Sequence, residues 1–242
     1  MSSRRKFIQT SAIALSASSL LPFSGAANTI QHKSMLKKEF LQTGMAGYSF
    51  VNYNIDQTIA IMNRTGINNI SVKDFHLPLN SSQQTIDEVM GKFKKGGIQV
   101  YTVGVIYMKT EAEVDRAFDY AKRVGVNLII GVPGYDLLTY TEKKVKEYNI
   151  RIAIHNHGPE DKLYPGPKDV YNRISGMDKR VGLCLDIGHA FRAGVMPDKA
   201  VTDYAPRIFD LHIKDVTAAK AEGKAIEAGR GAIDFPALIA AL

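Results

Sequence analysis

The feature that most constrains this chain is a regular alternation of short β-branched runs with longer amphipathic stretches, which continues from Phe40 to Leu242. Each run and its following stretch together span roughly 25 to 30 residues, the length of a strand–helix unit. Repeated units of this kind predict right-handed crossovers and a parallel sheet. The predicted strands are Gly44–Phe50, Asn69–Lys73, Gln99–Val105, Leu128–Val132, Ile150–His155, Val181–Asp186 and Ile208–Lys214.

Several stretches between these strands have the start and stop signals of helices. Glycines follow their ends, and Asp56 and Glu111 lie near the beginnings of two of them, as expected for the C-terminal cap and the first turn of a helix. The clearest predicted helices are Ile55–Thr65, Ser82–Lys95 and Glu111–Arg123, followed by Gly66, Gly96 and Gly125.

The predicted fold class is α/β, a parallel (β/α) barrel of the TIM type. A doubly wound sheet normally has a glycine-rich phosphate turn after its first strand, and none follows Phe50. Residues Asp234 to Leu242 read as the seventh helix, so the eighth strand of a complete barrel is missing. We therefore expect a C-terminally incomplete barrel from a truncated chain, whose open seam would favour association between copies into a homo-oligomer.

The positive charge of the chain is concentrated at its N-terminus. The formal net charge is +7, and six of these charges belong to basic residues among the first 38, where no Asp or Glu occurs. From Glu39 onward the net charge is therefore only +1. This distribution argues against a phosphate-binding face and against nucleic acid as a partner.

The N-terminal segment has the pattern of an export signal. Arg4-Arg5-Lys6-Phe7-Ile8 precedes a short apolar stretch that ends in small residues at Ala26-Ala27. Paired arginines in this context resemble a twin-arginine signal. We expect residues 1–27 to be this signal, 28–42 a leader and 43–242 the barrel, in a protein exported to the periplasm. The apolar run is too short for a convincing membrane span, so none is expected after cleavage.

Five of the six histidines lie at or just after predicted strand ends, together with carboxylates. In a β/α barrel these ends meet at one mouth, where the chemistry takes place. Imidazoles and carboxylates there predict a site for one divalent ion, and Mn²⁺, Zn²⁺, Co²⁺ or Fe²⁺ would fit. The four segments are Lys73-Asp74-Phe75-His76, His155-Asn156-His157-Gly158-Pro159-Glu160, Asp186-Ile187-Gly188-His189 and His212-Ile213-Lys214-Asp215.

The period of two along a strand predicts which side chains share a face. His155 lies on the same face as His157, and His212 on the same face as Lys214. The apolar residues between them are expected to face the helices: Ile152, Ile154, Leu211 and Ile213. Cys184, the only cysteine, lies in an apolar run and reads as a buried, inert thiol.

The segments that begin at His155, Asp186 and His212, together with Gly229-Arg230-Gly231, resemble the xylose-isomerase-like barrel superfamily. The resemblance covers roughly residues 43 to 242. That group contains sugar-phosphate isomerase/epimerase-like proteins and, more distantly, endonuclease IV-type enzymes. By this resemblance Asp186 and His212 match metal ligands of the sixth and seventh strands. The fifth-strand ligand is a glutamate in many relatives, whereas this chain offers His155, His157 or Glu160, and the sequence does not choose among them.

The resemblance also implies residues that act on the substrate. His189 matches a substrate-contacting histidine and Arg230 a substrate-orienting position. Lys73 and His76 resemble the substrate-facing end of the second strand. Lys214 fits either a substrate contact or a charge partner of Asp215. Glu160, His189, Lys214 and Arg230 are thus the catalytic candidates. Glu160, His157 and the glutamate that the family carries on the missing eighth strand are the candidate acid/base groups.

The chemistry that this resemblance implies is metal-dependent proton abstraction next to a sugar carbonyl, which isomerises or epimerises the sugar. Export argues against phosphorylated substrates, which are mainly cytoplasmic. We therefore expect a free or oxidised sugar or glycoside, with lyase chemistry on a 3-keto-glycoside as the specific hypothesis. The alternatives are an endonuclease IV-type phosphodiesterase and a non-catalytic carbohydrate-binding barrel.

Overall fold

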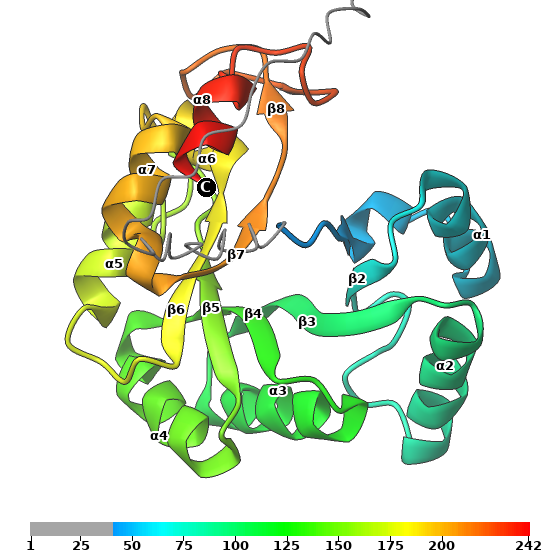
Figure 1. Ribbon diagram of the computed structural model, residues 1–242. Coiled ribbons are helices and arrows are strands. Elements are labelled where there is room, and N and C mark those ends of the chain that lie inside the picture. Colours follow the sequence, from blue (N-terminus) through cyan, green and yellow to red (C-terminus); the bar gives the residue numbers. More distant parts are fainter. Residues whose placement is uncertain (1–40) are drawn as a thin grey trace, which may run out of the picture. The chain divides into compact units, whose positions relative to one another are not determined.

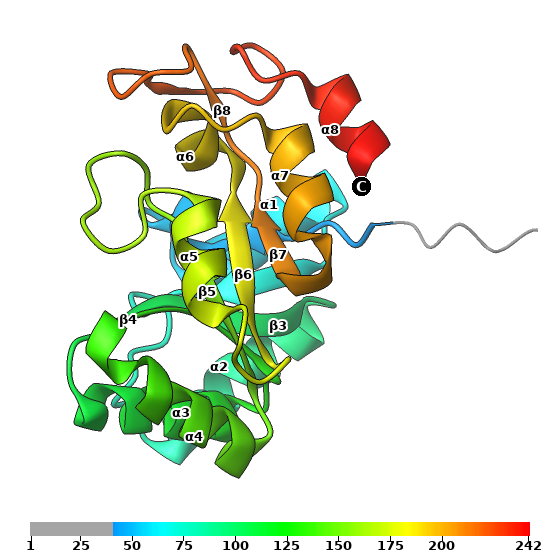
Figure 2. The same cartoon turned by 90° about the vertical axis from the view of Figure 1, so that its left-hand side faces the viewer.

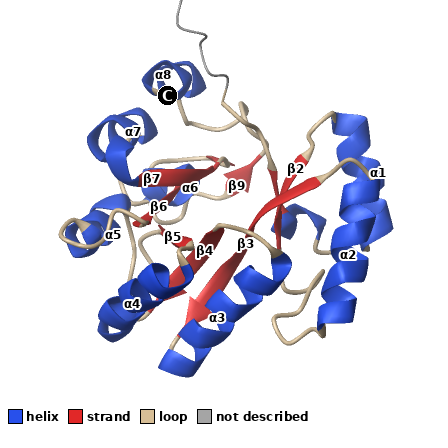
Figure 3. Ribbon diagram, turned by 60° about the horizontal axis from the view of Figure 1, so that its bottom comes forward, coloured by secondary structure: helices blue, strands red, loops and turns tan. Residues whose placement is uncertain are grey.

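The computed structural model describes residues 41–242, which form one curled sheet of parallel strands with helices on its outer side (Figures 1 and 3). The strands pair in chain order from β1 to β7, all in parallel. The predicted α/β barrel of the TIM type is confirmed, with seven parallel strands within the described residues. The strands are β1 (Met45–Ala46), β2 (Asn69–Val72), β3 (Gln99–Met108), β4 (Leu128–Pro133), β5 (Arg151–His155), β6 (Val181–Asp186) and β7 (Ile208–His212).

Helices follow the strands and cover the outside of the sheet (Figure 3). They are α1 (Ile55–Thr65), α2 (Gln83–Lys95), α3 (Glu111–Val124), α4 (Leu138–Tyr148), α5 (Pro167–Ile174), α6 (Ile187–Arg192), α7 (Pro197–Tyr204) and α8 (Phe235–Ala241). Within residues 41–242, three short 3₁₀ helices occupy Gly47–Phe50, Tyr135–Leu137 and Ala205–Arg207. Beyond β7, an antiparallel pair, β8 (Asp215–Val216) and β9 (Ala225–Ile226), leads to α8, which packs against α7 (Figure 2).

Local signals in the sequence account for the helix boundaries. Asn54 and Gln57 form a reciprocal capping box at the start of α1, with an Asn54 Oδ1 to Gln57 N distance of 2.9 Å. Gly66 ends the same helix in the left-handed conformation, with φ of 70°. Both arrangements satisfy backbone groups that a helix end would otherwise leave unpaired. The predicted range Ile55–Thr65 is therefore confirmed residue for residue.

The alternation of side chains along the strands creates two apolar cores. Ile129, Ile152 and Leu183 belong to the larger core between the sheet and the helices. Their neighbours Ile130 and Cys184 belong to a smaller cluster, with Leu128 and Ala153, that fills the inside of the barrel. Opposite faces of each central strand are thus both buried, as expected for a parallel sheet covered by helices.

Four predicted strands are shorter in the structure, and two of them, Asn69–Lys73 and Ile150–His155, lose only one residue each. The strand expected over Gly44–Phe50 ends at Ala46, and the 3₁₀ helix follows it. The chain turns here because Gly47 packs directly on β2; a Cβ at this position would lie 2.6 Å from the carbonyl oxygen of Ser71. The strand expected over Ile208–Lys214 ends at His212, so Ile213 is 51% exposed instead of facing the helices.

The predictions for the N-terminus fall on residues that the structure does not describe. The export signal at 1–27 and the leader at 28–42 lie outside the described residues, except for Leu41 and Gln42. Within residues 41–242, no helix combines the length and apolar composition that a membrane span requires.

Candidate metal centre at the barrel mouth

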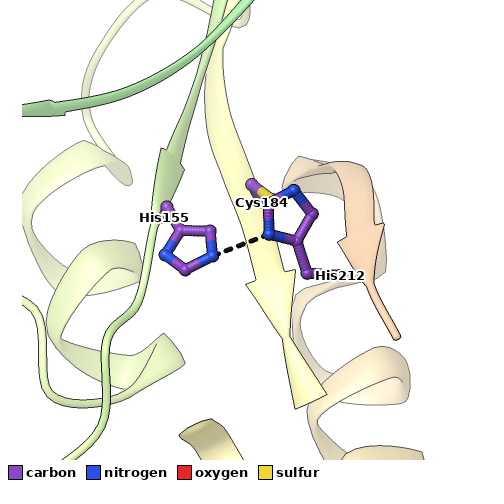
Figure 4. Close-up of side chains that lie close together, drawn as sticks. All are labelled: His155, Cys184 and His212. Carbon is purple, nitrogen blue, oxygen red and sulfur yellow. Dashed lines mark hydrogen bonds between the residues drawn. The ribbon is translucent and has the colours of Figure 1, made fainter. Parts of the chain in front are cut away.

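Three of the four predicted metal ligands meet at the carboxyl ends of β5, β6 and β7. His155 Nε2 lies 2.8 Å from His212 Nδ1 and 3.4 Å from Asp186 Oδ2. His212 Nδ1 lies 4.0 Å from the same carboxylate oxygen. Figure 4 shows the two imidazoles reaching toward each other across β6. The strand register explains this, because Asp186 pairs with His212, and His155 pairs with the residue two positions before Asp186.

Asp186 is held in place by its own helix and by Asn156. Asp186 Oδ1 accepts a hydrogen bond of 2.9 Å from the backbone N–H of His189 and so caps α6. The buried Asn156 amide donates to the backbone oxygen of Asp186 and accepts from its N–H, at 3.1 and 2.9 Å. No role was predicted for Asn156. Its position between His155 and His157 is the sequence feature from which a role at the site could have been predicted.

The second carboxylate oxygen of Asp186, Oδ2, indicates whether the site suits a cation. Asp186 Oδ2 is buried and accepts no hydrogen bond of good geometry from any residue within 41–242. Lys214 Nζ lies 3.0 Å away as a charge partner. A buried carboxylate oxygen needs positive charge beside it, which Lys214 supplies here and which a bound cation would also supply. One carboxylate and two imidazoles also form a donor set typical of zinc and related ions. His155, Asp186 and His212 therefore fit a divalent metal.

The electrostatics of the cluster leave these donors ready to bind. Burial lowers the pKa of His155, and it lowers the pKa of His212 to about 4. Burial alone would raise the pKa of Asp186, but contact with His155 and the charge of Lys214 outweigh it, so this pKa is lowered. At neutral pH the imidazoles are neutral and the carboxylate is ionised. These are the protonation states that metal ligands need.

His157, the other predicted fifth-strand ligand, has a different partner. The Tyr107 hydroxyl and His157 Nε2 are hydrogen-bonded at 2.8 Å. The His157 ring packs against His155 with centroids 4.4 Å apart. Of the three candidates that the sequence left open, His155 is the one in contact with both Asp186 and His212. Sequence reasoning missed Tyr107, since the predicted strand ended at Val105 while β3 continues to Met108.

The catalytic candidates Lys214 and His189 lie at this centre, whereas Glu160 pairs with Arg192. Lys214 Nζ lies 3.2 Å from His189 Nε2, and burial lowers the pKa of His189 to about 4. Glu160, in the loop between β5 and α5, forms an ion pair with Arg192 at the end of α6. The same Arg192 donates to the backbone oxygen of Ala221 at 3.0 Å, which links α6 to the loop between β8 and β9.

Lys214 is not the charge partner of Asp215, one of the two roles expected for it. The Asp215 carboxylate is buried and accepts backbone N–H groups of Val216, Gly229, Gly231 and Ile233 instead. It thereby folds the loop after β9 on which Arg230 lies. Arg230 itself is exposed, and its backbone N–H bonds to Glu227.

The two predicted substrate-binding residues of the second strand have local partners. Lys73 Nζ donates to the Val105 oxygen at 2.7 Å and lines a cavity of about 240 Å³ that Tyr107 also lines. His76 is buried, and its Nε2 lies 2.9 Å from the backbone oxygen of Tyr53. The contacts of His76 thus tie the loop after β2 to the loop before α1, whereas Lys73 lies beside a small cavity that His155, Asp186 and His212 do not line.

Comparisons with known proteins agree with this architecture. Rhizopine catabolism protein MocC of Rhizobium meliloti is 28% identical over 117 residues, which make up 42% of this chain and 35% of MocC. The matched stretch therefore spans about a third of that relative. The solved IOLI protein with a bound zinc atom superposes with a TM-score of 0.70 at 18% identity, covering 83% of this chain and 84% of that one.

A further solved structure is 3-keto-D-glucoside 4-epimerase, YcjR, from E. coli in its apo form. It has a TM-score of 0.67 at 16% identity, and the match covers 84% of this chain and 86% of the epimerase. At such identities the likeness of these structures shows the fold alone. The family model described as Xylose isomerase-like TIM barrel matches residues 60–242, most of the chain. The chain belongs to the Xylose isomerase-like TIM barrel family.

Proposed function

We propose that this chain is a metal-dependent enzyme of the sugar isomerase and epimerase kind, which abstracts a proton next to a sugar carbonyl. The observation that carries the proposal is the Asp186 Oδ2 atom, buried without a well-formed hydrogen bond within residues 41–242 and lying 3.4 and 4.0 Å from two imidazole nitrogens. His155, Asp186 and His212 would hold one divalent ion, with Mn²⁺, Zn²⁺, Co²⁺ and Fe²⁺ as candidates. When bound, such an ion stabilises negative charge on neighbouring sugar oxygens.

The side chains around the centre would balance charge or transfer protons. Lys214 places a positive charge 3.0 Å from Asp186, where it would balance charge that develops on the substrate. His189 is neutral at physiological pH because its pKa is lowered to about 4, so its unprotonated ring nitrogen, beside Lys214 or Arg192, would accept a proton. His157 is the second acid/base candidate, with Tyr107 as its hydrogen-bond partner. Glu160 would have to leave Arg192 before acting on a substrate.

We propose 3-keto-glycosides as the substrate class, with elimination of the substituent where it can leave. The carbonyl acidifies the neighbouring C–H, and a substituent beta to the resulting carbanion can depart. A structural neighbour is named as a 3-keto-D-glucoside 4-epimerase, and this supports a keto sugar as the substrate class. Arg230, Lys73 and His76 stay candidate substrate contacts.

We further propose that the protein works in the periplasm after twin-arginine export, which would allow a metal to be loaded before the folded protein crosses the membrane. This part of the proposal rests on Arg4, Arg5 and the apolar stretch that follows them. Free or oxidised sugars, rather than phosphorylated ones, are the substrates that this location would offer. Homo-oligomerisation through the sheet edges at β1 and β7 belongs to the same proposal.

Proton abstraction can be tested directly by exchange with solvent. The metal-stripped chain would be reloaded with zinc, cobalt, manganese or iron, and a methyl 3-keto-glucoside would be followed by NMR in D₂O. We expect metal-dependent deuterium incorporation next to the carbonyl, with or without release of methanol. The parent glucoside, which lacks the carbonyl, should show no exchange.

The Asp186→Asn variant is the matched control, because it removes the charge while keeping a helix-capping side chain. Metal binding without exchange or turnover of the keto sugar would contradict the proposed reaction. Sugar binding by metal-free protein, again without exchange, would instead indicate a non-catalytic carbohydrate-binding barrel.

A further inference from the structure

Cys184 lies directly beneath the metal centre, in the interior column of β6. Residues 182, 184 and 186 alternate onto the inner face of this strand, and the ring of Phe209 covers Gly182 at the bottom. Cys184 is in register with His155 on one side and with Asp210 on the other. It is therefore the next inward-facing side chain below Asp186, on the floor of the site.

The sulfur is close to the same two imidazoles that approach Asp186. Ligand atoms of His155, Cys184 and His212 all lie within 4.8 Å of one another. Figure 4 shows this trio, with the Cys184 sulfur beside the His212 ring. All three side chains come from neighbouring strands of a closely packed barrel, so their backbones hold them in place.

A second observation also points to a ligand here. His212 Nε2 and His155 Nδ1 are buried and find no hydrogen-bond partner within residues 41–242, as is true of Asp186 Oδ2. His155 is only 4% exposed. Of these atoms, Asp186 Oδ2 faces the same two imidazoles that lie close to the sulfur, and few buried polar atoms lack a hydrogen bond in a protein interior.

We propose that Cys184 is the sulfur ligand of the metal centre and that its thiolate makes the site select zinc or cobalt over manganese or magnesium. The inference rests on the metal site of the proposed function, but not on the reaction. Together with His155, Asp186 and His212 it completes a set of one sulfur, two nitrogens and one oxygen, a four-ligand set that suits tetrahedral zinc. Thiolate is a soft ligand, which manganese and magnesium bind poorly.

Coordination requires the thiol to lose its proton. Burial raises the pKa of Cys184 well above its usual value, so the metal-free protein holds a neutral thiol. On binding, the S–H bond breaks, the sulfur electron pair forms the bond to the metal, and the proton passes to solvent. The buried thiol predicted from the sequence is thus present, with a ligand role in place of an inert one.

Cobalt absorption provides a readout that is independent of activity. A cobalt–thiolate bond gives an intense charge-transfer band in the near ultraviolet, which nitrogen and oxygen ligands do not. We would compare the wild-type chain with Cys184→Ser, and use Ile130→Val as the matched control. Ile130 belongs to the same interior cluster but offers no donor atom. Zinc and manganese affinities would be measured by competition with a chromophoric chelator.

We expect the band in the wild type and in Ile130→Val, and its loss in Cys184→Ser. Zinc affinity of Cys184→Ser should fall at least about tenfold. Replacing a residue that only hydrogen-bonds to a metal ligand already lowers metal affinity by about that factor. Manganese affinity should change far less. If Cys184→Ser does not fold, the ¹¹³Cd NMR shift of the cadmium-loaded wild type answers the same question, since a sulfur ligand moves it strongly downfield.

The outcomes separate this inference from the proposed function. Absence of the charge-transfer band, or a cadmium shift typical of nitrogen and oxygen ligands, overturns the role of Cys184. If Asp186→Asn then still loses metal, the metal site of the proposed function stands. If neither variant changes metal binding, both proposals fail.

Discussion

The two carboxylate oxygens of Asp186 contact different groups and so have different roles. Oδ1 caps α6 through the N–H of His189, and Oδ2 faces His155 and Lys214. Asn156 fixes the backbone of the same residue with two hydrogen bonds. A carboxylate restrained this firmly loses little further freedom when it binds a ligand, which favours affinity.

Asp186→Asn should separate these roles. An asparagine still caps α6, so the free energy of unfolding should change little, whereas the charge that attracts a cation is lost. We expect zinc affinity to fall by more than about a hundredfold. That factor is the largest loss typical when a residue that only hydrogen-bonds to a metal ligand is replaced. Isothermal titration calorimetry would measure the zinc affinity. Asp115→Asn, at a surface carboxylate paired with Lys144, is the control and should bind zinc normally. Equal affinities for the two variants would contradict the assignment.

Lys214→Met should affect turnover and metal binding in opposite ways. The ammonium group lies close to Asp186 and His189, so it would stabilise negative charge on a substrate while repelling a metal ion. We expect kcat on the best keto sugar to fall by about a hundredfold, as for removal of one electrostatic donor. Zinc affinity should stay equal or rise. A loss of zinc binding would show that Lys214 instead supports the fold of the site.

At the scale of elements, Arg207 joins the end of α5 to the start of β6. Its guanidinium donates to the backbone oxygens of Ser175, Met177, Asp178 and Val181 at 2.8 to 3.2 Å. Carbonyl groups that follow a helix end have no partner within the helix, and a cation suits that negative end. The arginine thus fixes the entry of the strand that ends in Asp186.

Arg207→Ala should destabilise the fold without touching the ligands. Four carbonyl oxygens would lose a charged donor, so the free energy of unfolding should fall by about 2 kcal/mol. Urea unfolding followed by circular dichroism would measure it. Lys199→Ala, at an exposed position on α7, should have almost no effect. An Arg207→Ala midpoint equal to the wild-type value would show that water replaces these hydrogen bonds at no cost.

At the scale of the whole molecule, the buried histidines make the metal-free fold sensitive to acid. Burial lowers the pKa of His155 and His157, and it lowers the pKa of His189 and His212 to about 4. In the unfolded chain each histidine titrates near about 6.5. Between these values the unfolded state binds more protons than the folded state, so stability must fall as the pH falls.

We therefore expect the urea midpoint of chelator-treated protein to decrease steadily from pH 7 to pH 5. Carboxylates with lowered pKa values act in the same direction but at lower pH, so histidines dominate this window. Added zinc should raise the urea midpoint at pH 7, because it binds the folded state by mass action. The increase should be smaller at pH 5, where protons compete with zinc for the imidazoles. A midpoint that stays constant between pH 7 and pH 5 would contradict neutral buried histidines.

Much of the architecture was predictable because it depends on short-range interactions. The capping box at Asn54 and the glycine at Gly66 act within a few residues, and they set the limits of α1. The strand Val181–Asp186 also has the predicted bounds, since a run of apolar residues buried on both faces is unambiguous. The same alternation placed His155 and Asp186 at strand ends on one side of the barrel.

Only the tertiary structure decided which side chains touch. A register shift between β6 and β7 at Leu183 and Cys184 brings Asp186 opposite His212, and no count along one strand reveals such a shift. The tertiary structure also places Lys214 beside Asp186 rather than Asp215, and the Cys184 sulfur close to two imidazoles. The sequence by itself determined the elements and the edge where the polar residues gather, because those follow from periodicity. The contacts within that edge depend on how twisted neighbouring strands are aligned, which is set only when the sheet curls.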